Sequence, residues 1–290
     1  MELFTQIPLP NHFITLTPQS RVCTLGSCFS QHVGEQLQKR MGEEMVTVNP
    51  FGVLYNPVSI AQAIEVLTDE SYDISVKVFK GQEGVFHSWL HTNRFSASTE
   101  AECREKIVQG ALSARHALRT ADLLCVTFGT VRCYRLADSD FIVANCHKEP
   151  SKCFVEEEYE LQTLLERWRS TLSVLKSYNP KIKVCFTVSP YRYKKYGYHI
   201  SQLHKAQLLL LADALVKEFP WTAYFPAYEI MLDELRDYRF YNPDMLHPSE
   251  QAVEIISSRF ADWTFSPELH VVAKENLKRW KQSQHREMVR

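Results

Sequence analysis

The fold and the candidate site both begin in the stretch RVCTLGSCFSQHVGEQLQKRM, residues 21–41. Its first five residues are mostly apolar and end at Gly26, which is typical of a buried strand. Four apolar residues then recur every four positions, as on one face of a helix: Phe29, Val33, Leu37 and Met41. A strand that turns directly into a helix at a glycine predicts a parallel sheet covered by helices.

The same alternation continues along the chain. Four further strands are predicted between helical segments: Met45 to Val48, Asp122 to Phe128, Ile182 to Val188 and Thr222 to Phe225. Five strands with helical crossovers predict an α/β fold, a three-layer α/β/α sandwich around a five-stranded, mainly parallel sheet of the flavodoxin-like type. Binding and catalytic residues in such a sheet are expected at the carboxyl ends of the strands.

The domain organisation follows from interruptions of this alternation. Residues 1–265 are predicted to form a single domain, and an irregular, aromatic-rich insertion occupies about residues 69–98. Long ordered insertions are often functional. A charged helix is predicted in residues 266–290.

Composition excludes several classes of function. The chain has 290 residues, 45% of them hydrophobic, and a formal net charge of −1, so no overall field attracts nucleic acid or an anionic membrane. The N-terminus lacks a secretory pattern and no apolar run is long enough to span a bilayer, which predicts a cytoplasmic protein. The eight cysteines form no CxxC pair and are expected to be reduced. The spacing of the histidines predicts no metal site, and no cofactor is expected.

Three residues carry the candidate chemistry. Ser27 follows the first strand, and Asp244 and His247 lie in one turn before the last core helix. A serine hydroxyl needs a neighbouring base to become a nucleophile, and a carboxylate three residues before a histidine can fix the tautomer of that base. The alternatives are a helix N-cap for Ser27 and a local cap and turn for the other two.

Two further side chains have open roles. Cys28 is expected to point away from the site and to pack against the sheet, and the alternative is a reactive thiol at a helix N-terminus. His87, in the insertion, is predicted either to line a substrate pocket or to pack within the loop.

The chain also resembles the GSCFA family, a branch of the SGNH (GDSL-type) hydrolases. The motifs that carry this resemblance are GSCFS at 26–30, where the family has Ala at the fifth position, VNPFGVLYNP at 48–57, ANCHK at 144–148, TVSP at 187–190, and the run from Tyr224 through Ser249. The resemblance extends from about Arg21 to Trp263.

The resemblance implies an SGNH-hydrolase fold and ester chemistry, with Ser27 as nucleophile, His247 as general base and acid, and Asp244 as the orienting carboxylate. It also implies an oxyanion hole made by the Ser27 amide, the Gly52 amide and an asparagine side chain after the third strand. The sequence departs from the family at this last position, because TFGTV (127–131) has a valine there, which donates no side-chain hydrogen bond. Asn145, brought back by a hairpin, is expected to replace it, and the alternatives are the hydroxyl of Thr130 or a backbone amide.

Three functions follow as hypotheses. The first is a serine esterase or deacylase that acts on a small ester, with an acylated carbohydrate as one substrate that the resemblance suggests. The second is an acyltransferase that uses the same acyl-enzyme in a drier pocket. The third is a ligand-binding protein on the same scaffold, favoured by the missing asparagine. The partner in each case is a small molecule or carbohydrate rather than nucleic acid, and the oligomeric state is left open.

Overall fold

In the computed structural model, which describes residues 5–288 and their side chains as far as residue 284, a five-stranded parallel sheet forms the centre of the molecule. Its order is β10-β9-β5-β1-β2, with β1 at Val22–Gly26, β2 at Val46–Val48, β5 at Leu123–Phe128, β9 at Lys183–Val188 and β10 at Thr222–Tyr224. Strand β1 pairs in parallel with both β2 and β5. The five strands predicted from the sequence are therefore confirmed.

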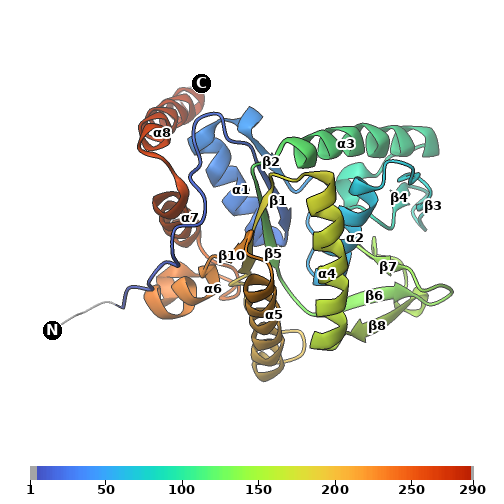
Figure 1. The fold of residues 1–290 in the computed structure, drawn as a ribbon. Helices are drawn as coiled ribbons and strands as arrows, with labels where there is room; N and C mark the ends of the chain where they lie inside the picture. The colour runs from blue at the N-terminus through green and yellow to red at the C-terminus, as the bar shows by residue number, and fades with distance from the viewer. Residues whose placement is uncertain (1–4, 289–290) are drawn as a thin grey trace.

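Helices cover both faces of this sheet (Figure 1). One core includes residues of α2 (Pro57–Thr68), α3 (Glu100–Thr120), α4 (Leu161–Tyr178) and α5 (Tyr198–Glu218). The other includes residues of α1 (Cys28–Met41), α7 (Glu250–Thr264) and α8 (Pro267–Met288). The three-layer α/β/α architecture is confirmed. Throughout residues 5–288, every helix is too short or too polar to cross a membrane.

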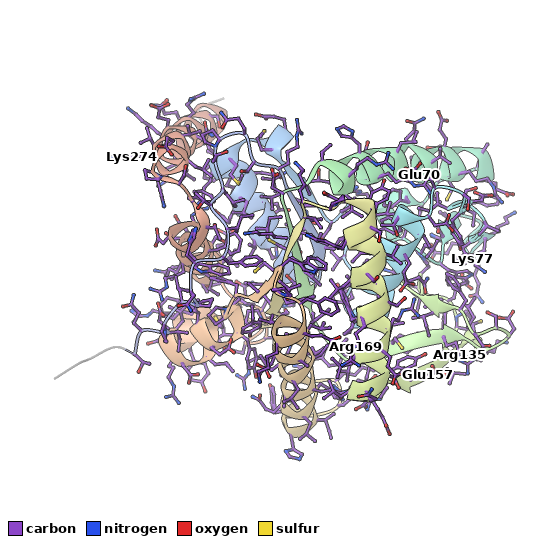
Figure 2. The ribbon with its side chains drawn as sticks, viewed as in Figure 1. Glu70, Lys77, Arg135, Glu157, Arg169 and Lys274 are labelled. Atoms are coloured by element: carbon purple, nitrogen blue, oxygen red, sulfur yellow. The ribbon has the colours of Figure 1, made fainter. Side chains whose placement is uncertain are left out.

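Two small antiparallel sheets flank the main one. Strands β3 (Val78–Lys80) and β4 (Phe86–Ser88) form a hairpin in the insertion. Strands β6 (Arg132–Leu136), β7 (Ile142–Val143) and β8 (Phe154–Glu158) form a sheet in the order β7-β6-β8. Figure 2 shows Arg135 and Glu157 side by side on this sheet, where Arg135 Nε lies 2.6 Å from Glu157 Oε1. The hairpin that the sequence predicted before Asn145, with strands at Cys133 to Leu136 and Phe141 to Ala144, is formed by β6 and β7. Strand β8 was not predicted.

Short helical segments complete the connections. They are η1 (Glu43–Met45), η2 (Asn93–Phe95), η3 (Ser151–Cys153), α6 (Ala227–Glu229), η4 (Ile230–Glu234) and η5 (Tyr238–Phe240).

Gly26 explains how β1 and β5 approach each other at their carboxyl ends. Its φ is +151°, and a Cβ built on it would lie 2.4 Å from the carbonyl oxygen of Thr127. Any side chain here would force the two strands apart. The glycine therefore lets β1 end against β5 and brings the next residue, Ser27, to the end of the sheet.

The segment before β1 is tied to the end of α7. Leu16 forms a parallel bridge with Phe265, and its N–H donates to the carbonyl of Thr264 at 2.7 Å. The indole N–H of Trp263 donates to the carbonyl of Pro10 at 3.0 Å. Residues from both ends of the described chain thus complete one side of the core.

Candidate active site

A cavity of about 400 Å³ opens at the carboxyl ends of the central strands. Ser27 lines it from the end of β1, Gly129 from the end of β5 and Ser189 from the end of β9. The β7-β6-β8 sheet and the segment after β7 supply another wall. His247 reaches the same cavity from the loop before α7. The structure therefore brings Ser27 and His247 to one cavity at the edge of the sheet where the fold class predicts a site.

Ser27 is the N-cap residue of α1 by position, but its side chain does not cap the helix. The residue is 1% exposed, and its hydroxyl finds no hydrogen-bond partner among the described residues. Its N–H donates to the Thr127 carbonyl at 3.3 Å. A buried hydroxyl without a partner costs about 1–3 kcal/mol, so this arrangement does not support the helix-cap alternative.

Asp244 organises the turn that carries His247. One carboxylate oxygen, Oδ1, accepts the N–H groups of Leu246 at 2.9 Å and of His247 at 3.0 Å. The other, Oδ2, lies 2.5 Å from Nδ1 of the His247 ring. The two backbone amides and the imidazole lower the pKa of Asp244 to about 2. An ionised Asp244 accepts a proton-bearing Nδ1, which leaves Nε2 of His247 as the nitrogen that can accept a proton.

The loop around this pair is exposed and is attached to its surroundings at a few points. The side chains of His247 and Asp244 are 39% and 44% exposed. Tyr191 packs against the His247 ring with centroids 4.4 Å apart, and the Arg192 N–H donates to the Leu246 carbonyl at 3.0 Å. Met245 has a φ of 60°, a left-handed conformation that is unfavourable for a residue with a side chain.

Ser27 and His247 are not joined directly, since the Ser27 hydroxyl is unpaired within the described part of the chain. In unliganded enzymes, catalytic hydrogen bonds are often long and shorten only when substrate binds. Ser27 and His247 thus line one cavity without a direct hydrogen bond from the Ser27 hydroxyl.

The structure separates the residues expected to stabilise an oxyanion. Gly52 lies outside the cavity lining: its N–H donates to the Asn49 carbonyl at 2.7 Å, and a Cβ on it would collide with Thr92. Thr130 and Asn145 both line the cavity. Asn145 Oδ1 accepts the N–H of His147 at 2.7 Å, so its amide N–H groups are the part that can donate to a ligand.

Asn56 is a cavity residue that sequence reasoning missed. Its Oδ1 accepts the Ser59 N–H at 2.8 Å and so caps α2, and the residue is 6% exposed at the cavity wall. Because Oδ1 is used for the cap, the amide N–H groups of Asn56 are the side that can donate to a ligand. The signal was present as an asparagine before Pro57 at a helix start, but that pattern predicts only a cap.

His87 lies outside the cavity lining, in the insertion. Its Nδ1 is 2.6 Å from the Ser96 hydroxyl, and its ring stacks on that of His147 with centroids 4.6 Å apart. His147 in turn contacts Asn93 Oδ1 at 2.6 Å and donates from Nε2 to the Ser88 carbonyl at 2.8 Å. The insertion thus braces the segment that carries Asn145 rather than contributing His87 to the pocket.

Cys28 differs from expectation. Its side chain lines the cavity instead of pointing away from it, and burial raises the pKa of its thiol. A raised pKa keeps the thiol protonated and lowers its reactivity. Within residues 5–284, no three His, Cys, Asp or Glu side chains form a group that could hold a metal ion.

Comparisons with known proteins point to one family. The model of the GSCFA family matches residues 21–260, which confirms the resemblance seen in the motifs. A search among curated proteins found no match.

Solved structures with a similar arrangement include two carbohydrate esterases of family 3. The one from Talaromyces cellulolyticus is 8% identical, with a TM-score of 0.41 over 89% of this chain and 99% of that chain. The one from Clostridium thermocellum is 9% identical, with a TM-score of 0.40 over 85% and 94%. An acetyl xylan esterase from Butyrivibrio proteoclasticus is 8% identical, with a TM-score of 0.42 over 84% of this chain and 63% of that chain.

Proposed function

The chain belongs to the GSCFA family, and from that premise we propose that it is a serine esterase or deacylase with Ser27 as the nucleophile. One observation carries the proposal: Ser27 and His247 line the same cavity, and Asp244 holds Nδ1 of His247 at 2.5 Å. A hydroxyl, a base with its free nitrogen available and an orienting carboxylate are the three groups that acyl transfer through a serine requires.

The proposed reaction has two halves. Ser27 Oγ attacks the ester carbonyl carbon while Nε2 of His247 takes its proton. The tetrahedral intermediate then expels the alcohol, which receives that proton from His247, and leaves an acyl group on Ser27. Water attacks the acyl carbon with His247 as base, and the carboxylic acid is released as Ser27 regains its proton.

The oxyanion needs donors near Ser27. We assign this role to the side-chain amides of Asn56 and Asn145, with the Thr130 hydroxyl as a further donor, because all three line the cavity. The Gly52 amide is not assigned, since it is already donated to Asn49. Loss of one such donor typically lowers the rate ~100- to 1000-fold.

The cavity wall supports a polar alcohol as the leaving group. Four tyrosines line the wall beside Arg132: Tyr55, Tyr134, Tyr191 and Tyr193. Tyrosine rings present an apolar face together with a polar hydroxyl. A sugar likewise has apolar C–H faces and polar hydroxyl groups, so the two surfaces suit each other. We therefore favour a short acyl ester of a carbohydrate, within a cavity of about 400 Å³.

The first test is labelling by a fluorophosphonate serine probe, read by intact mass. We expect one adduct on the wild type and none on Ser27→Ala or His247→Ala. Ser30→Ala is the matched control, because Ser30 lies three residues further on, in α1, and is buried, with its hydroxyl 3.2 Å from Asn49 Oδ1. This variant should label like the wild type. Absence of an adduct on folded wild-type protein would refute the esterase proposal.

A second candidate, a ligand-binding protein, is favoured by one observation. The Ser27 hydroxyl is unpaired among the described residues, and its N–H is given to Thr127 rather than to the cavity. This function predicts that a panel of acylated sugars binds wild type and Ser27→Ala with equal affinity and that neither hydrolyses them. Hydrolysis by the wild type but not by Ser27→Ala would exclude the ligand-binding function.

A further inference from the structure

A buried lysine lies beneath the cavity. Lys205, on α5, is 3% exposed, and its Nζ donates to the carbonyl of Gly129 at 2.8 Å and to the carbonyl of Ser189 at 2.6 Å. Burial lowers the pKa of Lys205 to about 7. Burying an amine is costly, and an apolar side chain of similar volume is often cheaper. The two hydrogen bonds therefore need an explanation beyond packing.

The first acceptor belongs to the nucleophile's side of the site. Gly129 is the residue directly after β5, and both Gly129 and Ser27 line the cavity. A Cβ built on Gly129 would lie 3.3 Å from the Cβ of Ser27. The peptide that Lys205 holds is thus in near contact with the side chain of the nucleophile.

The second acceptor belongs to the side of the base. Ser189 is the residue directly after β9, and its hydroxyl accepts the Tyr191 N–H at 3.4 Å. Tyr191 packs on the His247 ring, and the next residue, Arg192, donates its N–H to the Leu246 carbonyl at 3.0 Å. The segment after β9 is therefore the support on which the His247 loop rests.

We propose that Lys205 is a positioning residue that sets the separation of Ser27 and His247. One amine joins the loop that touches Ser27 to the loop that supports His247. Both the charged and the neutral amine have enough N–H groups to donate to two carbonyls. A misplacement of about 1 Å between reacting groups can lower a rate ~100-fold, so a link of this kind bears directly on acyl transfer. The proposal rests on the function proposed above.

The test compares Lys205→Met with wild type and with Lys217→Met. Methionine keeps an unbranched apolar stem and removes the donors. Lys217 is the control because it lies on the same helix, exposed and paired with Asp213 at 2.7 Å. For the fluorophosphonate probe, we expect Lys205→Met to lower the maximal rate of Ser27 labelling ~10- to 100-fold, with little change in the probe concentration that gives half of that rate. Lys217→Met should behave as wild type.

Hydrogen exchange supplies a readout that does not depend on catalysis. Lys205→Met should raise amide exchange in residues 127–131, 188–193 and 242–248, with no matching rise in β1, and Lys217→Met should not. A lysine that merely fills space predicts labelling kinetics and loop exchange like those of wild type, and that result overturns the proposal. If the wild type does not label at all, the esterase function fails, and the exchange data alone decide whether Lys205 links the loops.

Discussion

The regions that carry Ser27 and His247 to the cavity differ in how deeply they are buried. Ser27 is 1% exposed and lies where β1 turns into α1, so the main sheet and its first helix hold it on both sides. His247 and Asp244 are 39% and 44% exposed, on a loop between η5 and α7. The proposed nucleophile, Ser27, therefore belongs to the core, and the proposed base, His247, lies on a surface loop.

This difference in burial indicates which of the two regions moves more easily. Regions with few buried contacts open at a lower free energy than the core does. The region around Ser27 therefore moves only when the sheet itself is disturbed. The position of His247 depends on the Asp244 turn, on packing by Tyr191 and on the hydrogen bond from the Arg192 N–H to the Leu246 carbonyl. Closure of His247 onto Ser27 is expected to be a movement of the loop.

The largest effect is expected from a substitution that disturbs the packing of β1 against β5 beside Ser27. Gly26→Ala would place a Cβ 2.4 Å from the Thr127 carbonyl oxygen, so β1 and β5 would have to separate. We expect a loss of about 3 kcal/mol or more in the free energy of unfolding, measured by urea denaturation. Gly84→Ala is the control, since its Cβ meets no described atom within 4 Å and only its φ of +78° is unfavourable; it should cost about 1 kcal/mol. Equal costs would contradict the close approach of the strands.

The next effect comes from a substitution that disturbs the His247 loop and leaves the core intact. Asp244→Asn removes the ionised acceptor of His247 Nδ1 and allows the wrong tautomer. We expect labelling of Ser27 to slow ~100- to 10,000-fold while the protein stays folded. Asp237→Asn is the control, because Asp237 caps η5 through the Arg239 N–H without contacting the site. Labelling of Asp244→Asn at the wild-type rate would remove Asp244 from the mechanism.

Lys205, which links the loops of Gly129 and Ser189, should make the free energy of unfolding depend on pH. The folded protein lowers the pKa of Lys205 from 10.5 to about 7. Between those values the unfolded chain binds a proton that the folded chain has lost, so the free energy of unfolding rises with pH by up to ~1.4 kcal/mol per pH unit. Wild type should therefore gain stability relative to Lys205→Met between pH 7 and pH 9, measured by urea denaturation. A constant difference would mean that Lys205 stays charged.

The smallest effect is expected at one backbone position in the His247 loop. Met245 has a φ of 60°, which costs about 1 kcal/mol for a residue with a side chain. Met245→Gly should raise the thermal midpoint slightly while slowing labelling, because the base loop becomes more flexible. Lys148→Gly, at a φ of 61° and outside the cavity lining, should give a similar gain in stability and leave labelling unchanged. Destabilisation by Met245→Gly would show that the loop is not strained.

The fold could be predicted from the sequence because its signal is local. The middle strands β1, β5 and β9 are rich in apolar residues, and residues 123–128 are buried without interruption, so the run alone indicates a strand covered on both faces. Ser27, Asp244 and His247 could be proposed as a set because they stand next to strand and helix ends. Strand β8 was missed because its FVEEE sequence carries three glutamates, and only the cation-rich β6 beside it makes them favourable there.

The rest of the site depends on packing between distant segments. Lys205 stands in a leucine-rich helix, where a lysine ordinarily faces water, and only the positions of Gly129 and Ser189 turn it inward. The side chain of Cys28 could point either way from the start of α1, and the structure directs it into the cavity. His87 has the residue type of a site group, but its neighbours Ser96 and His147 hold it in the insertion.

The bridge from Leu16 to Phe265 also bears on how the chain is made. A ribosome releases Ser27 early and His247 late, and the partner of Leu16 comes later still. The segment before β1 therefore waits for its docking surface until α7 has been synthesised, and α7 directly follows the His247 loop. A nascent chain that stalls before residue 247 would carry Ser27 without His247, and one that stalls before residue 265 would lack the partner of Leu16.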